Sequence, residues 1–337
     1  MEFFAVSPRL NDPGQFLDAF EHTMKLAETH RLRGLLLFEG DRVPFDPWVL
    51  AQHIITRSDS LIPLLAVGPA YISAKEAARR LGNLHRLYGR PLAINLVAGA
   101  QAHTGSHAMR YQALHRFALS LDERLARLTE SRRSAPEEPD LLAGQPVAMR
   151  FVAGHSQDAV RLAARIGATN LRMLPSTLSA EIPAGCGLNF GVVTRPTTAA
   201  AWAQANTLFP HPASAARVAR RVAAHTDSHW KAELLTEAPS VPGFWRIPAQ
   251  TMKADSPFFV GSYREVARLF ADCRDAAVSA LLLDVPPSST EYDHLSQALQ
   301  LAQHHHEHPE EGAVNPLVDG IERQRPPSMS DHGRVTP

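Results

Sequence analysis

The sequence predicts a single (β/α)8 barrel, and the alternation of its apolar segments carries this prediction. Short apolar runs with the length of buried strands alternate with segments whose apolar residues recur at helical spacing. Eight such runs occur, and nearly all are followed by a helix, which is the pattern that closes most readily into a barrel. The predicted strands are residues 2–8, 33–39, 61–68, 91–99, 146–154, 169–175, 187–194 and 279–286. A doubly wound open sheet is the alternative fold.

The helices between these strands carry start and stop signals. In the third helix Ser73 stands three residues before Glu76, which is the spacing of a capping box. Gly167 follows the fifth helix at the position where a left-handed residue ends it. The predicted helices are residues 13–30, one that starts near 46–47, one that starts at 73, 107–130, 156–167, 197–209 and 262–276.

Two segments depart from the regular alternation. Residues 176–186, between the sixth and seventh strands, are too few for a normal crossover helix, so we expect that crossover to be shortened. Residues 209–261 form a long insertion rich in His, Trp and Pro. We expect one barrel domain over residues 1–306 and a disordered tail over 307–337, where apolar residues are few.

Composition describes an ordinary soluble protein. The 337 residues carry 34 basic and 34 acidic side chains, so no electrostatic footprint for nucleic acid is present. No apolar run is long enough to span a membrane, and the N-terminus lacks the pattern of a signal peptide, so we expect a cytoplasmic protein. The abundance of Arg and Ala over Lys suggests a bacterial source.

Cysteine and histidine usage predicts no metal site. Cys186 and Cys273 lie far apart in the sequence and are expected to be buried free thiols in a reducing compartment. The histidine run at 304–308 is expected to be solvated at a fraying helix end.

Two strands end in the same way, with an Ala-Gly pair that opens into polar residues. These pairs are Ala98-Gly99 and Ala153-Gly154, at the carboxyl ends of strands where barrels bind ligands. Gly154, His155 and Ser156 also stand at the N-terminus of a helix, where backbone N–H groups and a hydroxyl favour a phosphate. The alternative is that Ser156 only caps its helix.

The stretch 46–100 resembles the bacterial luciferase-like flavin monooxygenases, and the alkanesulfonate monooxygenases above all. It contains "DPW" at the start of the second helix, "AARRLGNLHRLYGR" in the third, and "NLVAG" at the end of the fourth strand, in the order typical of that family. The resemblance continues more weakly through "RFVAGHSQDAV", "VVTRPTTAAAWAQANTLF" and "FFVGSYREVARLF", and it covers most of residues 1–300.

The resemblance implies a TIM barrel that uses reduced FMN, supplied by a separate flavin reductase. By analogy the flavin would contact the ends of the third and fourth strands, at Gly68, Asn95, Ala98 and Gly99, and its phosphate would contact Gly154, His155 and Ser156. The family often dimerises through its second and third helices, here residues 47–57 and 73–87, so we expect a homodimer or a heterodimer with a homologous chain.

The polar residues of the family's site are mostly replaced in this chain. The positions of a His, a Cys, an Arg-x-His pair and a Tyr are occupied here by Leu10, Pro44, Asn189 with Gly191, and Pro286. Charged residues near the predicted strand ends or in the insertion are weak substitutes for acid–base or electrostatic work. Those considered are Arg9 with Asp12, Glu39 with Asp41, Asp284, and Arg246 with Lys253 in the insertion, which could fold over the barrel mouth.

Three functions are compatible with this pattern. The first is a monooxygenase that uses reduced FMN and O2 on a small or carrier-bound organic substrate. The second is a non-catalytic flavin-binding relative, or the partner subunit of a heterodimeric monooxygenase. The third is a barrel whose chemistry needs no flavin. The substrate and the atom oxygenated are left open.

Overall fold

The computed structural model describes residues 1–99, 106–133, 145–175, 182–210, 242–251 and 253–307. Eight parallel strands form a closed barrel, because the last strand pairs with both the first and the seventh. They are β1 (Glu2–Val6), β2 (Gly34–Leu37), β3 (Ile62–Val67), β4 (Leu92–Leu96), β5 (Val147–Ala153), β6 (Thr169–Met173), β7 (Gly187–Arg195) and β10 (Ala280–Asp284). The barrel prediction is therefore confirmed, and the open-sheet alternative is wrong.

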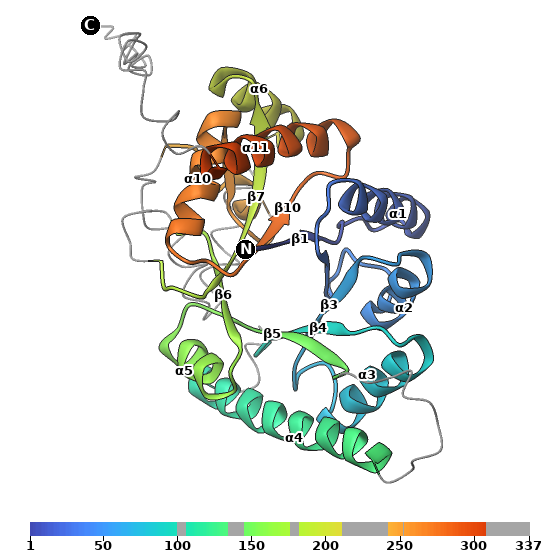
Figure 1. Ribbon diagram of the computed structural model, residues 1–337. Helices are drawn as coiled ribbons and strands as arrows, with labels where there is room; N and C mark the ends of the chain where they lie inside the picture. Colours follow the sequence, from blue (N-terminus) through green and yellow to red (C-terminus); the bar gives the residue numbers. More distant parts are fainter. Residues whose placement is uncertain (100–105, 134–144, 176–181, 211–241, 252, 308–337) are drawn as a thin grey trace, which may run out of the picture.

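Helices surround this barrel, as Figure 1 shows. They are α1 (Pro13–Thr29), α2 (Pro47–Arg57), α3 (Ala74–Tyr88), α4 (His107–Arg133), α5 (Gln157–Arg165), α6 (Thr198–Leu208), α9 (Ile247–Gln250), α10 (Tyr263–Asp275) and α11 (Ser289–Glu307). No helix among the described residues is long and apolar enough to cross a membrane. The interior of the barrel and its outer layer form separate apolar clusters, with Phe4, Leu64 and Phe151 in the interior one.

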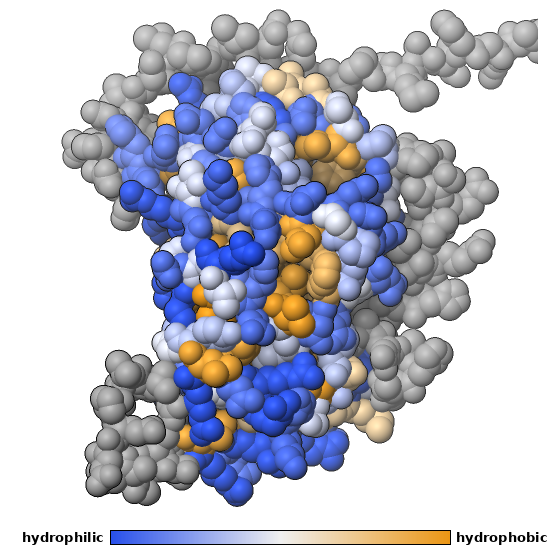
Figure 2. Space-filling view, turned by 90° about the vertical axis from the view of Figure 1, so that its right-hand side faces the viewer, coloured by the Kyte–Doolittle hydropathy of each residue, from blue (hydrophilic) through white to orange (hydrophobic). Residues whose placement is uncertain are grey.

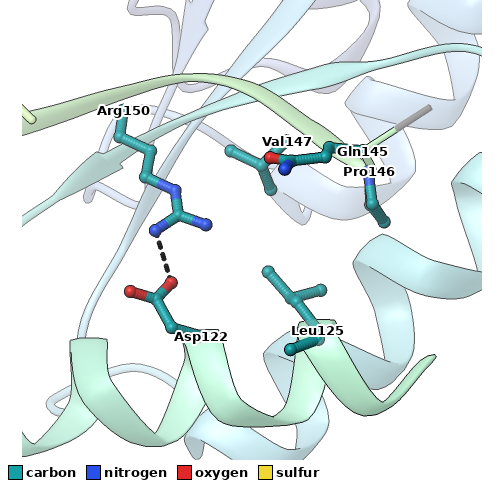
Figure 3. A pocket seen from close by; sticks show the side chains of 7 residues that line it. Asp122, Leu125, Gln145, Pro146, Val147 and Arg150 are labelled. Carbon is teal, nitrogen blue, oxygen red and sulfur yellow. Dashed lines mark ion pairs between the residues drawn. The ribbon is translucent and has the colours of Figure 1, made fainter. Parts of the chain in front are cut away.

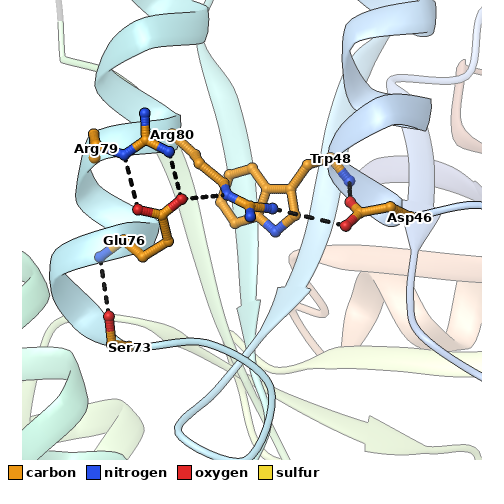
Figure 4. Close-up of polar contacts among 6 residues, drawn as sticks. All are labelled: Asp46, Trp48, Ser73, Glu76, Arg79 and Arg80. Atoms are coloured by element: carbon orange, nitrogen blue, oxygen red, sulfur yellow. Dashed lines mark hydrogen bonds and ion pairs between the residues drawn. The ribbon is translucent and has the colours of Figure 1, made fainter.

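Local signals in the sequence explain the ends of most helices. Ser73 accepts a hydrogen bond from the Glu76 N–H at 3.2 Å, as its spacing predicted. The Glu76 carboxylate, however, binds the side chains of Arg79 and Arg80. Figure 4 shows how this joins α3 to α2, because Arg80 also lies over the ring of Trp48 at 5.5 Å. The two strongest motifs of the sequence thus meet in a helix–helix contact.

The crossover from β6 to β7 is short, as predicted. Residues 174–175 and 182–186 are the described part of this connection, and none of them is helical. Residues 176–181 lie outside the described residues.

The insertion contributes two strands that sequence analysis missed. Strand β7 pairs with β10 as far as Gly191, and from Gly191 onward it pairs with β9 (Phe258–Ser262). Strand β8 (Phe244–Trp245) pairs antiparallel with β9 and ends the sheet. Helix α6 packs against this extension, and Trp245 and Phe258 form an apolar cluster with it. The end of the insertion is therefore part of the fold, whereas most of its first part, residues 211–241, lies outside the described residues.

Candidate functional site

The inward-facing residues at the ends of β3 to β5 are small or uncharged. Ala66 pairs in register with Asn95, and Asn95 pairs with Phe151, which belongs to the interior cluster. Because partners in register face the same side of a sheet, Ala66 and Asn95 also face the barrel interior. At Gly68 a Cβ would lie 2.0 Å from the carbonyl oxygen of Val97, so only glycine permits this approach of the two strand ends.

Asn95 and Asn189 are buried acceptors without partners among the described residues. Asn95 is only 5% exposed, and its Oδ1 has no hydrogen-bond partner among the described residues. The Oδ1 atom of Asn189 on β7 is also buried and has no hydrogen-bond partner among the described residues. Asn189 pairs in register with the interior residue Leu282. A buried unsatisfied acceptor is costly, so both atoms favour a ligand that brings N–H or O–H groups.

The turn after β5 is built around Tyr111. The Tyr111 hydroxyl donates to the carbonyl of Ala153 at 2.9 Å. Gly154 has φ of +134°, and a Cβ there would lie 2.2 Å from that hydroxyl. Burial raises the pKa of Tyr111, and a hydrogen bond with Ser156 offsets part of this rise. The turn therefore presents a neutral phenol beside a glycine and a serine.

Ser156 caps α5, as the more cautious interpretation of the sequence proposed. Its Oγ accepts from the Ala159 N–H at 3.2 Å, and α5 begins at the next residue. Capping does not remove the site for an anion, because several N–H groups of a first helical turn have no partner within the helix. Asp158 in that first turn would oppose an anion, while Arg110, buried at the start of α4, brings a positive charge near Tyr111.

His155 is fixed in a neutral form. Its Nε2 accepts a hydrogen bond from the Met173 N–H at 2.8 Å, which joins the turn to the end of β6. Burial lowers the pKa of His155 to about 4, and the charge of Arg172 acts in the same direction. A ring that accepts at Nε2 carries its proton on Nδ1. His155 therefore supplies this region with a neutral donor and no positive charge at neutral pH.

The opposite side of the mouth is charged. Arg9, after β1, donates from Nη1 to Asp284 at 2.8 Å and from Nε to Asp255 at 2.9 Å. Burial disfavours the Arg9 cation, but the two carboxylates outweigh it and raise its pKa. Burial raises the pKa of Asp284, so its ionised form depends on Arg9. Two of the predicted candidates, Arg9 and Asp284, thus lie together.

The other candidates lie apart from this group. Glu39 is largely exposed. Its partial desolvation and the charge of Asp46 raise its pKa, and Arg80 opposes this rise, which places Glu39 toward α2 and α3. Arg246 stands at the start of α9 in the insertion. Ala98 and Gly99 are half-buried, and Gly99 has φ of +79°.

An aromatic ring occupies the space beside Gly191, where the resemblance would place a histidine. A Cβ at Gly191 would lie 2.2 Å from the ring of Phe258. Phe258 comes from the insertion, so the insertion fills the space beside Gly191.

The described cavities lie elsewhere. Figure 3 shows a cavity of about 160 Å³ between α4 and the start of β5, with the ion pair of Arg150 and Asp122 at its edge. A second one, of about 450 Å³, lies between α1 and α2 and is lined by side chains such as Glu21 and His53. Neither cavity contains a predicted site residue.

Tyr111 and Asp255 are site residues that sequence analysis missed, and Tyr111 is the one at the turn after β5. It lies near the start of a long helix, and its contact with residues 153–156 joins segments that are far apart in the chain. No local pattern marks it, because a buried tyrosine on a helix is most often a core residue.

No known family profile matches the chain. It is 23% identical over 319 residues to the 4-(gamma-L-glutamylamino)butanoyl-(BtrI acyl-carrier protein) monooxygenase BtrO of Niallia circulans, covering 85% of this chain and 92% of the relative. The structure is similar to EDTA monooxygenase EmoA from Chelativorans sp. BNC1, with a TM-score of 0.64, 16% identity, and 90% and 94% of the two chains covered.

It is also similar to the FMN complex of the oxygenating constituent of 3,6-diketocamphane monooxygenase from Pseudomonas putida, with a TM-score of 0.58 and 14% identity over 89% and 96% of the chains. The fold is therefore a (β/α)8 barrel of the luciferase-like type. The three similar proteins named above are described as monooxygenases or as a component of one.

Proposed function

We propose that the chain is a flavin-dependent monooxygenase that uses reduced FMN and O2 on a small or carrier-bound organic substrate. The observation that carries the proposal is the turn at residues 153–156, where Gly154, Ser156 and the Tyr111 hydroxyl meet at the start of α5. Polar hydroxyls and a helix N-terminus suit one phosphate group without any need for a basic surface. The FMN complex of a similar fold and the carrier-bound substrate in the name of BtrO support it.

The residues at the ends of β3 to β5 fit a flat ring. Ala66 is small, Gly68 lets the two strand ends approach, and the unpartnered Oδ1 of Asn95 could accept from a ring N–H. Reduced FMN, supplied by a separate reductase, would provide the electrons that activate dioxygen. The chain's own part is to hold the phosphate through Ser156 and the free N–H groups of the first turn of α5, to bury the ring away from water, and to place Arg9 and Asp284 opposite it. Tyr111, whose proton goes to the Ala153 carbonyl, positions this turn.

The second candidate function is a non-catalytic flavin-binding protein or partner subunit. Phe258 beside Gly191, and the absence of the histidines, cysteine and tyrosine that the resemblance calls for, favour it. A partner subunit would be inactive alone and active with a homologous chain.

We further propose that two chains associate through α2 and α3. Val49 on α2 is 57% exposed and Leu87 on α3 is 72% exposed. Figure 2 shows apolar side chains in the middle of a mainly hydrophilic face on the side of the molecule that carries α1, α2 and α3. Light scattering should give twice the mass of 36.9 kDa, and Val49→Asp with Leu87→Asp should return the monomer. A dimer that survives both changes would refute this interface.

A titration with reduced FMN under anaerobic conditions tests the main proposal. We expect micromolar binding that Ser156→Ala weakens about tenfold, and a smaller effect of Ser156→Ala on riboflavin, which lacks the phosphate. Ser73→Ala is the matched control, because Ser73 caps α3 at the same distance of 3.2 Å. No binding of FMN in either redox state would refute the proposal for the isolated chain. Equal losses with FMN and riboflavin would place the phosphate elsewhere.

A further inference from the structure

Arg9 lies over the interior of the barrel. Its guanidinium stands 4.9 Å from the centre of the Phe38 ring, and Phe38 packs against the interior cluster. Asp284 pairs in register with Gly191 and lies two residues beyond the interior residue Leu282, so its carboxylate also faces inward. The cation is therefore held at the mouth, where a substrate would enter.

The two partners of Arg9 differ in exposure. The Asp284 side chain is 14% exposed, and the Arg9 side chain is 12% exposed, but the Asp255 side chain is 62% exposed. Asp284 therefore fixes the guanidinium from within, and Asp255 covers it from the solvent side. No further hydrogen-bond or ion-pair partner of Arg9 is found in the described part of the chain.

Asp255 makes one hydrogen bond where a carboxylate can make two. It accepts from Nε alone, although Nε and the neighbouring Nη2 of a guanidinium form a fork that matches the two oxygens of a carboxylate. Of the two donors on this edge, only Nε is bound by Asp255, and the Asp255 carboxylate is mostly exposed to solvent.

We propose that the substrate carries a carboxylate that replaces Asp255 on Arg9 and binds the Nε–Nη2 edge. The inference rests on the proposed function, because it takes the barrel mouth as the substrate site. The exchange costs little desolvation, since Asp255 returns to water, while Asp284 keeps Arg9 in position. Asp255 acts as an internal substitute for the substrate's carboxylate, and it protects the buried cation when substrate is absent.

A cationic substrate is the opposite possibility, because the three side chains carry a net charge of one negative unit. The geometry favours the carboxylate: both bonding oxygens of the aspartates point to Arg9, and the exposed member that can move away is an acid. These two possibilities predict opposite effects of neutralising Asp255.

The experiment is a ligand-observed NMR titration of the full chain, without flavin, using pentanoate, pentanamide and pentylammonium as probes. Pentanoate should bind, and pentanamide and pentylammonium should not. Asp255→Asn should tighten pentanoate binding about fivefold, because the competing charge is gone. Arg9→Gln should weaken it more than tenfold. The double variant Arg9→Gln, Asp284→Asn guards against misfolding, because it leaves no unpaired buried charge. It should show the same loss of pentanoate binding as Arg9→Gln.

The outcomes separate this inference from the proposed function. Glu76→Gln is the control: it breaks an exposed ion pair on α3, and it should leave pentanoate binding unchanged. Pentanoate binding that survives in the folded Arg9→Gln, Asp284→Asn variant would overturn the inference, as would binding of pentylammonium that Asp255→Asn abolishes. Reduced FMN is titrated separately into the same proteins. If FMN fails to bind while the pentanoate results hold, the monooxygenase proposal fails and the carboxylate site stands.

Discussion

The two sides of the barrel mouth differ in what fills them. At the ends of β3 to β5 the inward side chains are small or uncharged, and the nearest functional groups are hydroxyls and backbone amides around Gly154 and Ser156. At the ends of β7, β10 and β1 the space holds an ion-paired arginine and an aromatic ring from the insertion. One side is thus shaped by the barrel itself, and the other by a segment that returns to it.

This difference separates two tasks of an active site, which are to hold a cofactor and to select a substrate. A side lined by small residues can hold a large flat ligand with one anionic group, whatever the substrate. A side built from charged and aromatic side chains sets which substrate enters, and an insertion can change it without disturbing the barrel. The four predictions below test whether the two sides are as independent as this comparison requires.

The largest effect should follow loss of the buried partner of Arg9. Asp284→Asn leaves the guanidinium with Asp255 alone, and removing one member of a buried ion pair costs about 3 to 4 kcal/mol. Urea unfolding measures this loss. Flavin binding at the other side should stay within about twofold if the two sides are independent.

Two control variants sharpen this prediction. Arg9→Met with Asp284→Leu should recover at least half of the lost stability, because no buried charge is left unpaired. Asp122→Asn, in the more exposed pair beside the cavity of Figure 3, should cost only about 1 kcal/mol. Equal costs for Asp122→Asn and Asp284→Asn would mean that the mouth pair is an ordinary surface contact.

The second effect is a pH dependence on the uncharged side. His155 has a native pKa of about 4 and an unfolded value near 6.5. Between these values the unfolded chain binds a proton that the native chain does not, so stability falls as the pH drops below about 6.5. From pH 7.5 to 4.5 the loss from this group should be about 2 to 3 kcal/mol.

His155→Gln isolates this contribution, because glutamine can accept from the Met173 N–H but does not titrate. The unfolding free energy of the variant should fall less steeply with acidification than that of the natural chain. Parallel curves would show that His155 is protonated in the native state, and then this side of the mouth is not uncharged at low pH.

The side shaped by the barrel was the more predictable from sequence. Strand ends and the cap at Ser156 follow from residues that are neighbours in the chain. Tyr111 could not be found in this way, because its role depends on how α4 packs against the turn.

The charged side was predicted in pieces only. Arg9 and Asp284 were each recognised at a strand end, but their pairing follows from barrel closure through β1 and β10. Asp255 was not recognised, because it lies in an insertion whose strands β8 and β9 are short. Strand β9 pairs with β7, which already has a barrel neighbour, and β8 pairs only with β9 among the described strands. Sequence alternation gives the barrel order, but it does not show where β7 changes partner.

The third effect is steric and tests whether the insertion fills the mouth. Gly191→Ala places a Cβ in the Phe258 ring, which must move, and overpacking of this kind costs about 2 kcal/mol. Gly187→Ala on the same face of β7 is the control, because its nearest neighbour is a leucine methyl at 3.1 Å that can shift. Adding Phe258→Ala to Gly191→Ala should cost less than the sum of the single changes. If the two losses of stability are additive, the position of the Phe258 ring does not depend on the glycine at 191.

The smallest effect concerns the hydroxyl that the sequence did not reveal. Tyr111→Phe removes the hydrogen bond to the Ala153 carbonyl and the one with Ser156, so we expect a loss of about 1 kcal/mol in unfolding free energy. The same change should weaken FMN more than riboflavin, because the hydroxyl lies beside the proposed phosphate position. It should also make Gly154→Ala less harmful, since the atom that blocks a Cβ at 2.2 Å is gone. If Gly154→Ala is equally harmful in both backgrounds, the positive φ of Gly154 is the reason for the glycine, and Tyr111 is a neighbour that the turn does not require.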